Sequence, residues 1–248
     1  MRTIYILWLR QLKLYIRSKA RIIGSLGQPV LFLVALGFGF GPVFQQAGQG
    51  SYIQFLVPGI ISMGIIFTAL FSGISIIWDK QFGFLKETLV APVSRLEIMI
   101  GKTLGGSTVA VIQGLIILII SFFVGFQLQN IFYLPLIMLF MVLIAVLFAA
   151  VGTAIASVLE DMQGFQLIMN FLVMPLFFLS GAIFPLKGLP VFIDVLVKIN
   201  PLSYGVDGLR GALIGGSHFG LGTDILVLAI ITGILFALGS WLFSRIEI

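Results

Sequence analysis

The chain contains no cysteine and very few ionisable side chains. Of its 248 residues, none is Cys, one is His, and 9% are Asp, Glu, Lys or Arg. The lack of cysteine excludes disulfides and thiolate metal sites. Soluble domains carry about 25% charged residues, whereas 60% of this chain is hydrophobic. The composition therefore predicts an integral membrane protein.

Six hydrophobic segments are long enough to cross a bilayer, which takes about 20 apolar residues in a helix. They cover residues 22–40, 53–77, 104–126, 132–157, 165–184 and 224–243. We therefore expect an all-α integral membrane protein with six transmembrane helices and a single membrane domain over residues 1–248. Its expected parts are an N-terminal helix (1–21), spans one and two (22–77), a cytoplasmic loop (78–103), spans three to five (104–184), an external helical hairpin (185–223) and span six with a cytoplasmic tail (224–248).

The cores of these six segments contain no Asp, Glu, Lys, Arg or His. Ion-coupled carriers usually need ionisable groups at membrane depth to bind and release the ion, so this absence disfavours that class. Enzymatic chemistry is equally hard to assemble. His218 stands alone, and Glu160 and Asp161 are neighbours that would point in different directions on a helix. We expect no catalytic, metal or cofactor site in the chain.

One motif is similar to part of a nucleotide site. Gly101-Lys102-Thr103 matches the end of a phosphate-binding loop, but Leu96 occupies the position of the first glycine. No strand is expected before the motif, although such loops follow a strand. The chain itself is therefore not expected to bind ATP.

Lys and Arg are divided unequally between the two sides of the expected spans. Eleven of the 14 fall in residues 1–21, in residues 78–103 and in the C-terminal tail, and the other three are Lys187, Lys198 and Arg210. Cytoplasmic loops of membrane proteins carry the excess of basic residues. Both termini are therefore expected in the cytoplasm.

Residues 1–21 have the pattern of a basic amphipathic helix. At 100° per residue, Arg10, Lys13, Arg17 and Arg21 share one face. Such a helix lies in the membrane interface with its cations toward anionic headgroups. The alternative is a flank that only holds the N-terminus on the cytoplasmic side.

Residues 78–103 hold seven of the chain's 23 charged residues, more than any other gap between two hydrophobic segments. Residues 82–90 can form about two helical turns, which end at Ala91-Pro92 because the residue before proline avoids the helical region. A short helix exposed in the cytoplasm would give a soluble partner a surface to bind. The alternative is a solvated loop that contacts nothing.

Residues 182–222 are apolar but are interrupted by three prolines. The pattern predicts two short helices, at about 190–200 and 201–215, that lie in or dip into the outer leaflet. Two pairs have the spacing of helical ion pairs, Asp194 with Lys198 and Asp207 with Arg210. An ordinary external loop is the alternative.

Two motifs resemble those of the membrane subunits of type-2 ABC exporters. GFLKETL (83–89), PVSR (92–95) and Gly101-Lys102 are similar to the family's coupling loop. LSGAIFPL (179–186), Leu189-Pro190 and NPLSYGVDGLRG (200–211) are similar to its late motif. The resemblance covers essentially the whole chain and looks closest to the branch of small drug-resistance, nodulation-factor and polysaccharide permeases.

The resemblance implies a dimer of membrane subunits, of one kind or of two paralogues, in the cytoplasmic membrane of a prokaryote. Two separate ATPase subunits would bind ATP and Mg, and no nucleic acid would be involved. The residues that would bind the ATPase are Phe82, Phe84, Leu85, Lys86, Glu87, Leu89, Pro92 and Arg95. The residues that would form an external gate are Pro185, Pro190, Pro201, Tyr204, Asp207 and Arg210.

The substrate implied by this resemblance is a hydrophobic or amphiphilic molecule, such as a drug, a lipid or a lipid-linked glycan, exported from the cytoplasm. Candidate residues for its path are Phe67, Phe71, Asn170, Phe177 and Phe178. Two other classes of function stay open, an ion-gradient-driven carrier or channel and a non-transporting membrane scaffold. Transport that persists without an ATPase would indicate the former, and binding without ATP-dependent flux would indicate the latter.

Overall fold

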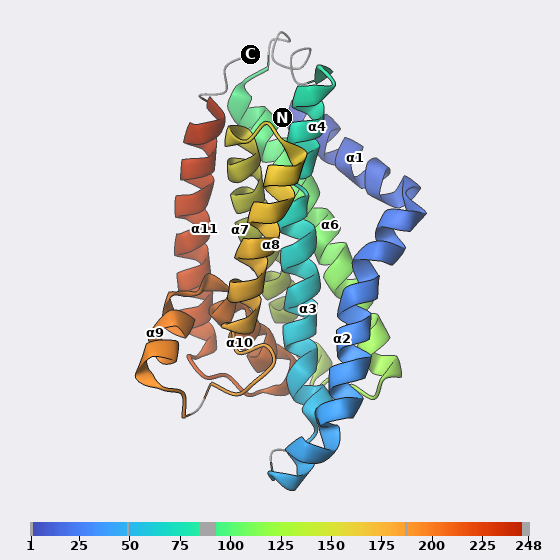
Figure 1. The fold of residues 1–248 in the computed structure, drawn as a ribbon, viewed down its shortest axis with the longest axis vertical. Helices are drawn as coiled ribbons and strands as arrows, with labels where there is room; N and C mark the ends of the chain where they lie inside the picture. Colours follow the sequence, from blue (N-terminus) through green and yellow to red (C-terminus); the bar gives the residue numbers. More distant parts are fainter. Residues whose placement is uncertain (1, 49, 85–92, 187, 245–248) are drawn as a thin grey trace.

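A computed structural model describes residues 2–48, 50–84, 93–186 and 188–244 (Figure 1). Within these ranges the chain is helical and forms no strand, which confirms the all-α prediction. The helices are α1 (Arg2–Arg17), α2 (Lys19–Gln46), α3 (Tyr52–Phe71), α4 (Ile74–Gln81), α6 (Arg95–Phe123), the 3-10 turn η1 (Ile131–Tyr133), α7 (Leu134–Val158), α8 (Met162–Phe178), α9 (Val191–Ile199), α10 (Pro201–Ile214) and α11 (Leu221–Ser244).

Five of the described segments are long and apolar enough to cross a membrane. They are α2, α3 with α4, α6, η1 with α7, and α11. The remaining predicted span corresponds to α8, which has only 17 residues. It ends at Phe178 rather than near residue 184 because the chain turns at Gly181, whose φ of +73° suits a residue without a side chain.

The centre of the bundle is formed by α3, α6 and α7, and α2 and α11 lie at its edges (Figure 1). Glycine allows the central helices to approach closely. Gly73 and Gly152 face each other where α7 crosses the α3–α4 junction, and a Cβ on Gly152 would overlap the carbonyl of Leu70. This packing fixes the position of α4 relative to α7.

Helix α1 lies obliquely across one end of the bundle and packs on α6 (Figure 1). Its buried residues are Leu7, Gln11 and Tyr15, and the absence of side chains at Gly101 and Gly105 of α6 makes room for the first two. The predicted helix over residues 1–21 is wrong at its end. The chain breaks at Ser18, whose φ and ψ of −98° and 81° are not helical, so Arg21 belongs to α2.

The region expected to form two short helices contains α9 and α10 at the opposite end of the bundle (Figure 1). The side chain of Asn200 caps α10 by accepting a hydrogen bond from the amide of Leu202, and Gly215 ends it at φ +75°. That these two helices lie in or dip into the outer leaflet stays a prediction. Residues 202–213 are mostly buried, because α10 packs against α3, α7 and α11.

Candidate functional site

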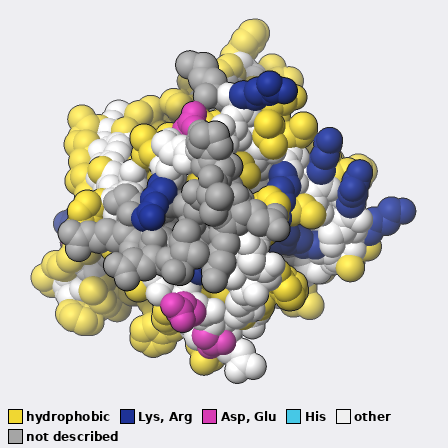
Figure 2. Space-filling model, turned by 90° about the horizontal axis from the view of Figure 1, so that it is seen from above, with side chains coloured by type: hydrophobic (Ala, Val, Ile, Leu, Met, Phe, Trp, Pro, Cys, Tyr) yellow, Lys and Arg dark blue, Asp and Glu magenta, His cyan; other side chains and the backbone are white. Residues whose placement is uncertain are grey.

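We call the end of the bundle formed by α1, α4, the first turns of α6 and the α7–α8 turn the basic end. Figure 2 looks onto this end, and Lys and Arg side chains gather on the side where Figure 1 shows α1. The end formed by α9, α10 and the start of α11 is called the α10 end. Each end holds a cluster of buried charged residues.

Asp79 is the centre of the cluster at the basic end. Its carboxylate accepts hydrogen bonds from both terminal nitrogens of Arg10, at 3.1 and 2.9 Å, and from Nζ of Lys102 at 2.5 Å. Asp79 is 5% exposed and Lys102 is 4% exposed. One carboxylate thus connects α1, α4 and α6 through charge-assisted bonds, the strongest kind that side chains make.

The expected cytoplasmic loop at residues 78–103 is shorter in the structure. Helix α4 continues to Gln81, and α6 begins at Arg95, where the hydroxyl of Ser94 accepts a hydrogen bond from the amide of Glu97. Asp79 and Lys102 therefore lie inside helices α4 and α6 and not in the loop between them. Because each charge has an opposite partner, the cost of burying it is offset.

Helix α4 is also bonded to the end of α7. Nζ of Lys80 donates to the carbonyls of Ser157 and Leu159 at 2.6 and 3.2 Å, and the side chain of Gln81 donates to the carbonyl of Glu160 at 3.1 Å. Carbonyls at a helix C-terminus lack helical partners, so a lysine there is favourable. Sequence analysis missed these contacts, because the partners are backbone atoms nearly 80 residues away.

The first predicted docking residues follow directly after α4. Phe82 is 71% exposed, and its ring stacks on that of Trp78 at 5.2 Å between centroids. The guanidinium of Arg10 lies 4.0 Å from the ring centroid of Phe84, within the range of a cation–π contact. Arg95 is the first residue of α6. The other predicted docking residues, Leu85, Lys86, Glu87, Leu89 and Pro92, lie outside the described residues.

Of the four basic residues expected on one interfacial face, three line one hollow of α1, namely Arg10, Lys13 and Arg17, whereas Arg21 lies on α2. Arg10 is turned toward Asp79, whereas Lys13 and Arg17 are exposed on α1. Arg21 lines a cavity from α2. Helical spacing thus predicted the shared face of α1 correctly, but it could not predict the bond between Arg10 and Asp79, which is 69 residues away.

At the α10 end, Asp207 and Arg210 are buried but bind different partners. The carboxylate of Asp207 accepts hydrogen bonds of 2.7–2.8 Å from the amides of His218 and Phe219. The guanidinium of Arg210 donates to the carbonyl of Gly181 at 2.8 Å and lies 4.1 Å from the ring centroid of Phe55. The predicted ion pair between Asp207 and Arg210 is therefore replaced by bonds from each of them to backbone groups.

Other bonds at this end also connect side chains with the backbone. Asn200 donates to the carbonyl of Leu176 at 2.7 Å, and Ser203 donates to that of Leu179 at 3.3 Å. The remaining residues of the predicted gate are Tyr204, whose hydroxyl donates to the carbonyl of Lys198 at 2.8 Å, and Pro185, Pro190 and Pro201, which lie before α9, at its cap and at the first position of α10. Asp224, near the start of α11, is fully buried and was not predicted.

The second predicted ion pair in this region is present on the surface. Nζ of Lys198 lies 2.7 Å from the carboxylate of Asp194. This hydrogen bond raises the pKa of Lys198 above its usual value. Both side chains are well exposed, so the pair has little effect on stability.

The five candidate residues for a transport path do not line one space. Phe67 and Phe71 of α3 are stacked at 6.2 Å and line the same cavity as Arg21. Phe177 is buried, and Asn170 and Phe178 lie on the exposed face of α8.

The membrane-spanning helices define the class as a multi-pass membrane protein. Residues 2–214 match the family model for the ABC-2 type transporter, so the chain belongs to this family of transport permeases. It is 31% identical over 202 residues to the inner membrane transport permease YadH of Escherichia coli, covering 81% of this chain and 78% of that protein. It is 27% identical over 200 residues to nodulation protein J of Rhizobium leguminosarum bv. trifolii, covering 79% and 75%.

Proposed function

We propose that the chain is the permease subunit of an ATP-driven exporter and that a separate ATPase binds it at the basic end. The observation that carries this proposal is the bonding of Asp79 to Arg10 and Lys102. These three residues lie on α1, α4 and α6, and the last two helices border residues 82–94. A push on that segment would therefore reach both spanning helices and α1 together.

The orientation in this proposal has the basic end and both termini on the cytoplasmic side. The uneven distribution of Lys and Arg supports it, because excess basic residues stay on that side. The family's YadH relative is named for the inner membrane, which suits a prokaryotic cytoplasmic membrane as the location.

A second membrane subunit, either a copy of this chain or a paralogue, would complete the transporter. Support comes from α8, whose outer face exposes Leu167 and Phe171 to 71% and 81% and carries the polar Asn170 among them. A polar side chain in an apolar helix is favourable where a neighbouring helix supplies a hydrogen-bond partner. The substrate would be a hydrophobic or amphiphilic molecule, because the spanning helices present few charges to it.

The test is purification of the tagged full-length chain from its native membrane, followed by identification of co-purifying proteins. We expect a stoichiometric ATP-binding subunit. Substituting Asp for both Leu85 and Leu89 should weaken its binding by roughly 30-fold or more, since an apolar anchor at an interface contributes on the order of 2 kcal/mol.

The matched control is the double variant Val191→Asp with Phe192→Asp on α9, which changes two exposed apolar residues at the α10 end. It should retain the ATPase. A chain that purifies alone, or an ATPase retained equally by the Leu85 and Leu89 double variant, would refute docking at this segment.

A further inference from the structure

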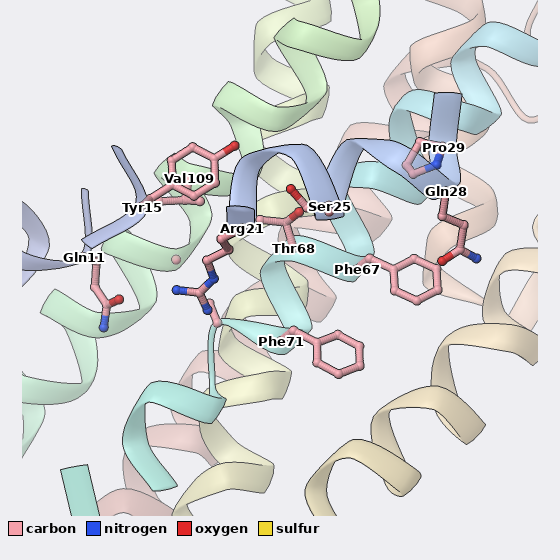
Figure 3. Close-up of a pocket in the computed structure, with 13 residues that line it drawn as sticks. Gln11, Tyr15, Arg21, Ser25, Gln28, Pro29, Phe67, Thr68, Phe71 and Val109 are labelled. Carbon is pink, nitrogen blue, oxygen red and sulfur yellow. The ribbon is translucent and has the colours of Figure 1, made fainter. Parts of the chain in front are cut away.

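A cavity of about 390 Å³ lies beside the junction of α1 and α2, and its function is not explained by the contacts at the basic end. Residues of α1, α2, α3 and α6 line it. Figure 3 shows the α1 residues at one side, the rings of Phe67 and Phe71 at the other, and the guanidinium of Arg21 between them. The two rings are the largest apolar groups of the lining, which also includes the polar side chains of Gln28 and Thr68.

Arg21 is the cation of this cavity. Within the part of the chain that the structure describes, its guanidinium makes no hydrogen bond or ion pair, unlike that of Arg10 on Asp79. A guanidinium has five N–H donors in a planar arrangement that fits a phosphate or carboxylate. The cavity thus offers an unused binding group for an anion.

The hydroxyl groups beside Arg21 are oriented by the protein. Tyr15 and Ser25 donate to the side-chain oxygen of Gln113, at 2.7 and 3.1 Å, and Ser25 also lies 3.0 Å from the carbonyl of Ile22. Burial raises the pKa of the Tyr15 phenol, so it stays neutral. With their hydrogens used in this way, both hydroxyl oxygens can accept a hydrogen bond from a hydroxyl group of the ligand.

The position of the cavity also favours a lipid. Arg21 is in the first turn of α2, a spanning helix, at the depth where headgroups meet hydrocarbon. Lys13 and Arg17 are exposed nearby on α1, and such basic residues attract anionic lipids. Phe67 and Phe71 of α3 and Pro29 of α2 line the cavity and give an acyl chain apolar groups to contact.

We propose that this cavity binds an anionic phospholipid from the leaflet at the basic end, with its phosphate on Arg21 and an acyl chain against Phe67 and Phe71. A headgroup with free hydroxyls, such as that of phosphatidylglycerol, suits the acceptors on Tyr15 and Ser25. The lipid would bridge α1 to α2 and α3. This site is independent of whether an ATPase drives transport, because the proposal concerns the membrane's own lipid.

The test measures thermal unfolding of the full-length chain in an uncharged detergent, with three additives supplied separately. Phosphatidylglycerol should raise the unfolding midpoint, whereas phosphatidylcholine and glycerol phosphate should not. The variant Arg21→Gln should bind phosphatidylglycerol on the order of tenfold more weakly, the usual effect of losing a hydrogen bond to a charged group. Arg17→Gln, a matched loss of charge on exposed α1, should behave like the unmodified chain.

A second pair of variants tests the cavity itself. A Cβ at Gly24 or Gly27 of α2 would meet open space, but only Gly24 lines the cavity. Gly24→Phe should abolish the stabilisation by phosphatidylglycerol, and Gly27→Phe should leave it intact.

Three results would overturn the proposal. An equal response to glycerol phosphate would indicate a site for a free anion, and an equal loss in the Arg21 and Arg17 variants would indicate general attraction to a basic surface. Stabilisation that persists in Gly24→Phe would show that the lipid binds elsewhere.

Discussion

The basic end and the α10 end both bury charged residues, but they satisfy them differently. At the basic end, Asp79 bonds to side chains of Arg10 and Lys102, so charge is paired with charge. At the α10 end, Asp207 and Arg210 bond to backbone amides and carbonyls. At the basic end, separate helices are therefore joined by ion pairs between side chains, which can break and form again. At the α10 end, side chains of α10 bond to backbone groups, whose positions depend on the local conformation of the chain.

This difference suits opposite roles in the proposed exporter. The ion pairs that join α1, α4 and α6 can break and form again if the helices shift, because they connect side chains through the attraction of opposite charges. Bonds from Asp207 to consecutive amides of residues 218 and 219 need one loop conformation. We therefore expect motion to enter at the basic end and the α10 end to keep its internal geometry.

The largest effect is expected from Asp79→Asn. The substitution keeps the shape but leaves Lys102 buried without its opposite charge, which should destabilise the chain by about 3–5 kcal/mol. The midpoint of thermal unfolding in detergent measures this effect. The double variant Asp79→Leu with Lys102→Met should recover most of the stability, since a buried pair can be replaced by apolar residues. If Asp79→Asn alone is neutral, the ion cluster does not hold the basic end.

A smaller effect is expected from Asp207→Asn at the α10 end. The new amide nitrogen would face N–H donors, so part of the hydrogen bonding to residues 218 and 219 is lost, at a cost of about 2 kcal/mol. The unfolding midpoint again measures it. Asp194→Asn, whose partner Lys198 is exposed, is the control and should change nothing measurable. An equal effect of the two substitutions would mean that burial at Asp207 is unimportant.

The smallest effect is expected from Arg10→Gln. Asp79 would keep its bond to Lys102, so stability should fall by only about 1 kcal/mol, as for one partly exposed ion pair. Because the charged link between α1 and Asp79 is lost while α4 and α6 stay joined by Lys102, ATPase coupling should decline more than stability does. Flux per ATP hydrolysed in reconstituted vesicles would show this, and a loss of flux matched by an equal loss of folded protein would argue against a coupling role.

The sequence predicted the elements that depend on local patterns. Helical hydrophobic runs located the spanning segments, and Asn200-Pro201 and Gly215 marked both ends of α10, because caps and turns depend on neighbouring residues. The boundaries at charged residues were predicted less well. The charge of Asp79 and Lys102 suggested a loop, but the two residues pair across 23 positions and continue their helices.

Long-range partners explain what the sequence could not indicate about the candidate sites. Spacing correctly brought Asp194 and Lys198 together, since both lie one helical turn apart. The same spacing wrongly predicted an ion pair between Asp207 and Arg210. Their hydrogen-bond partners are backbone groups of residues 218, 219 and 181, and helical spacing does not predict contacts with residues outside the helix. Arg21 was likewise assigned to the wrong helix because the break at Ser18 carries no strong signal such as proline or glycine.

The length of α8 has a consequence for the membrane around it. Its 17 residues rise about 26 Å, less than the roughly 30 Å of hydrocarbon in a bilayer. A helix that falls short usually thins the bilayer, because its last carbonyls need water or headgroups. Here Asn200, Ser203 and Arg210 bond to the carbonyls of residues 176, 179 and 181. Asn200 thus bonds to a carbonyl in the last turn of α8, and Ser203 and Arg210 bond to two carbonyls just beyond its end, as water or headgroups would do at an exposed helix end.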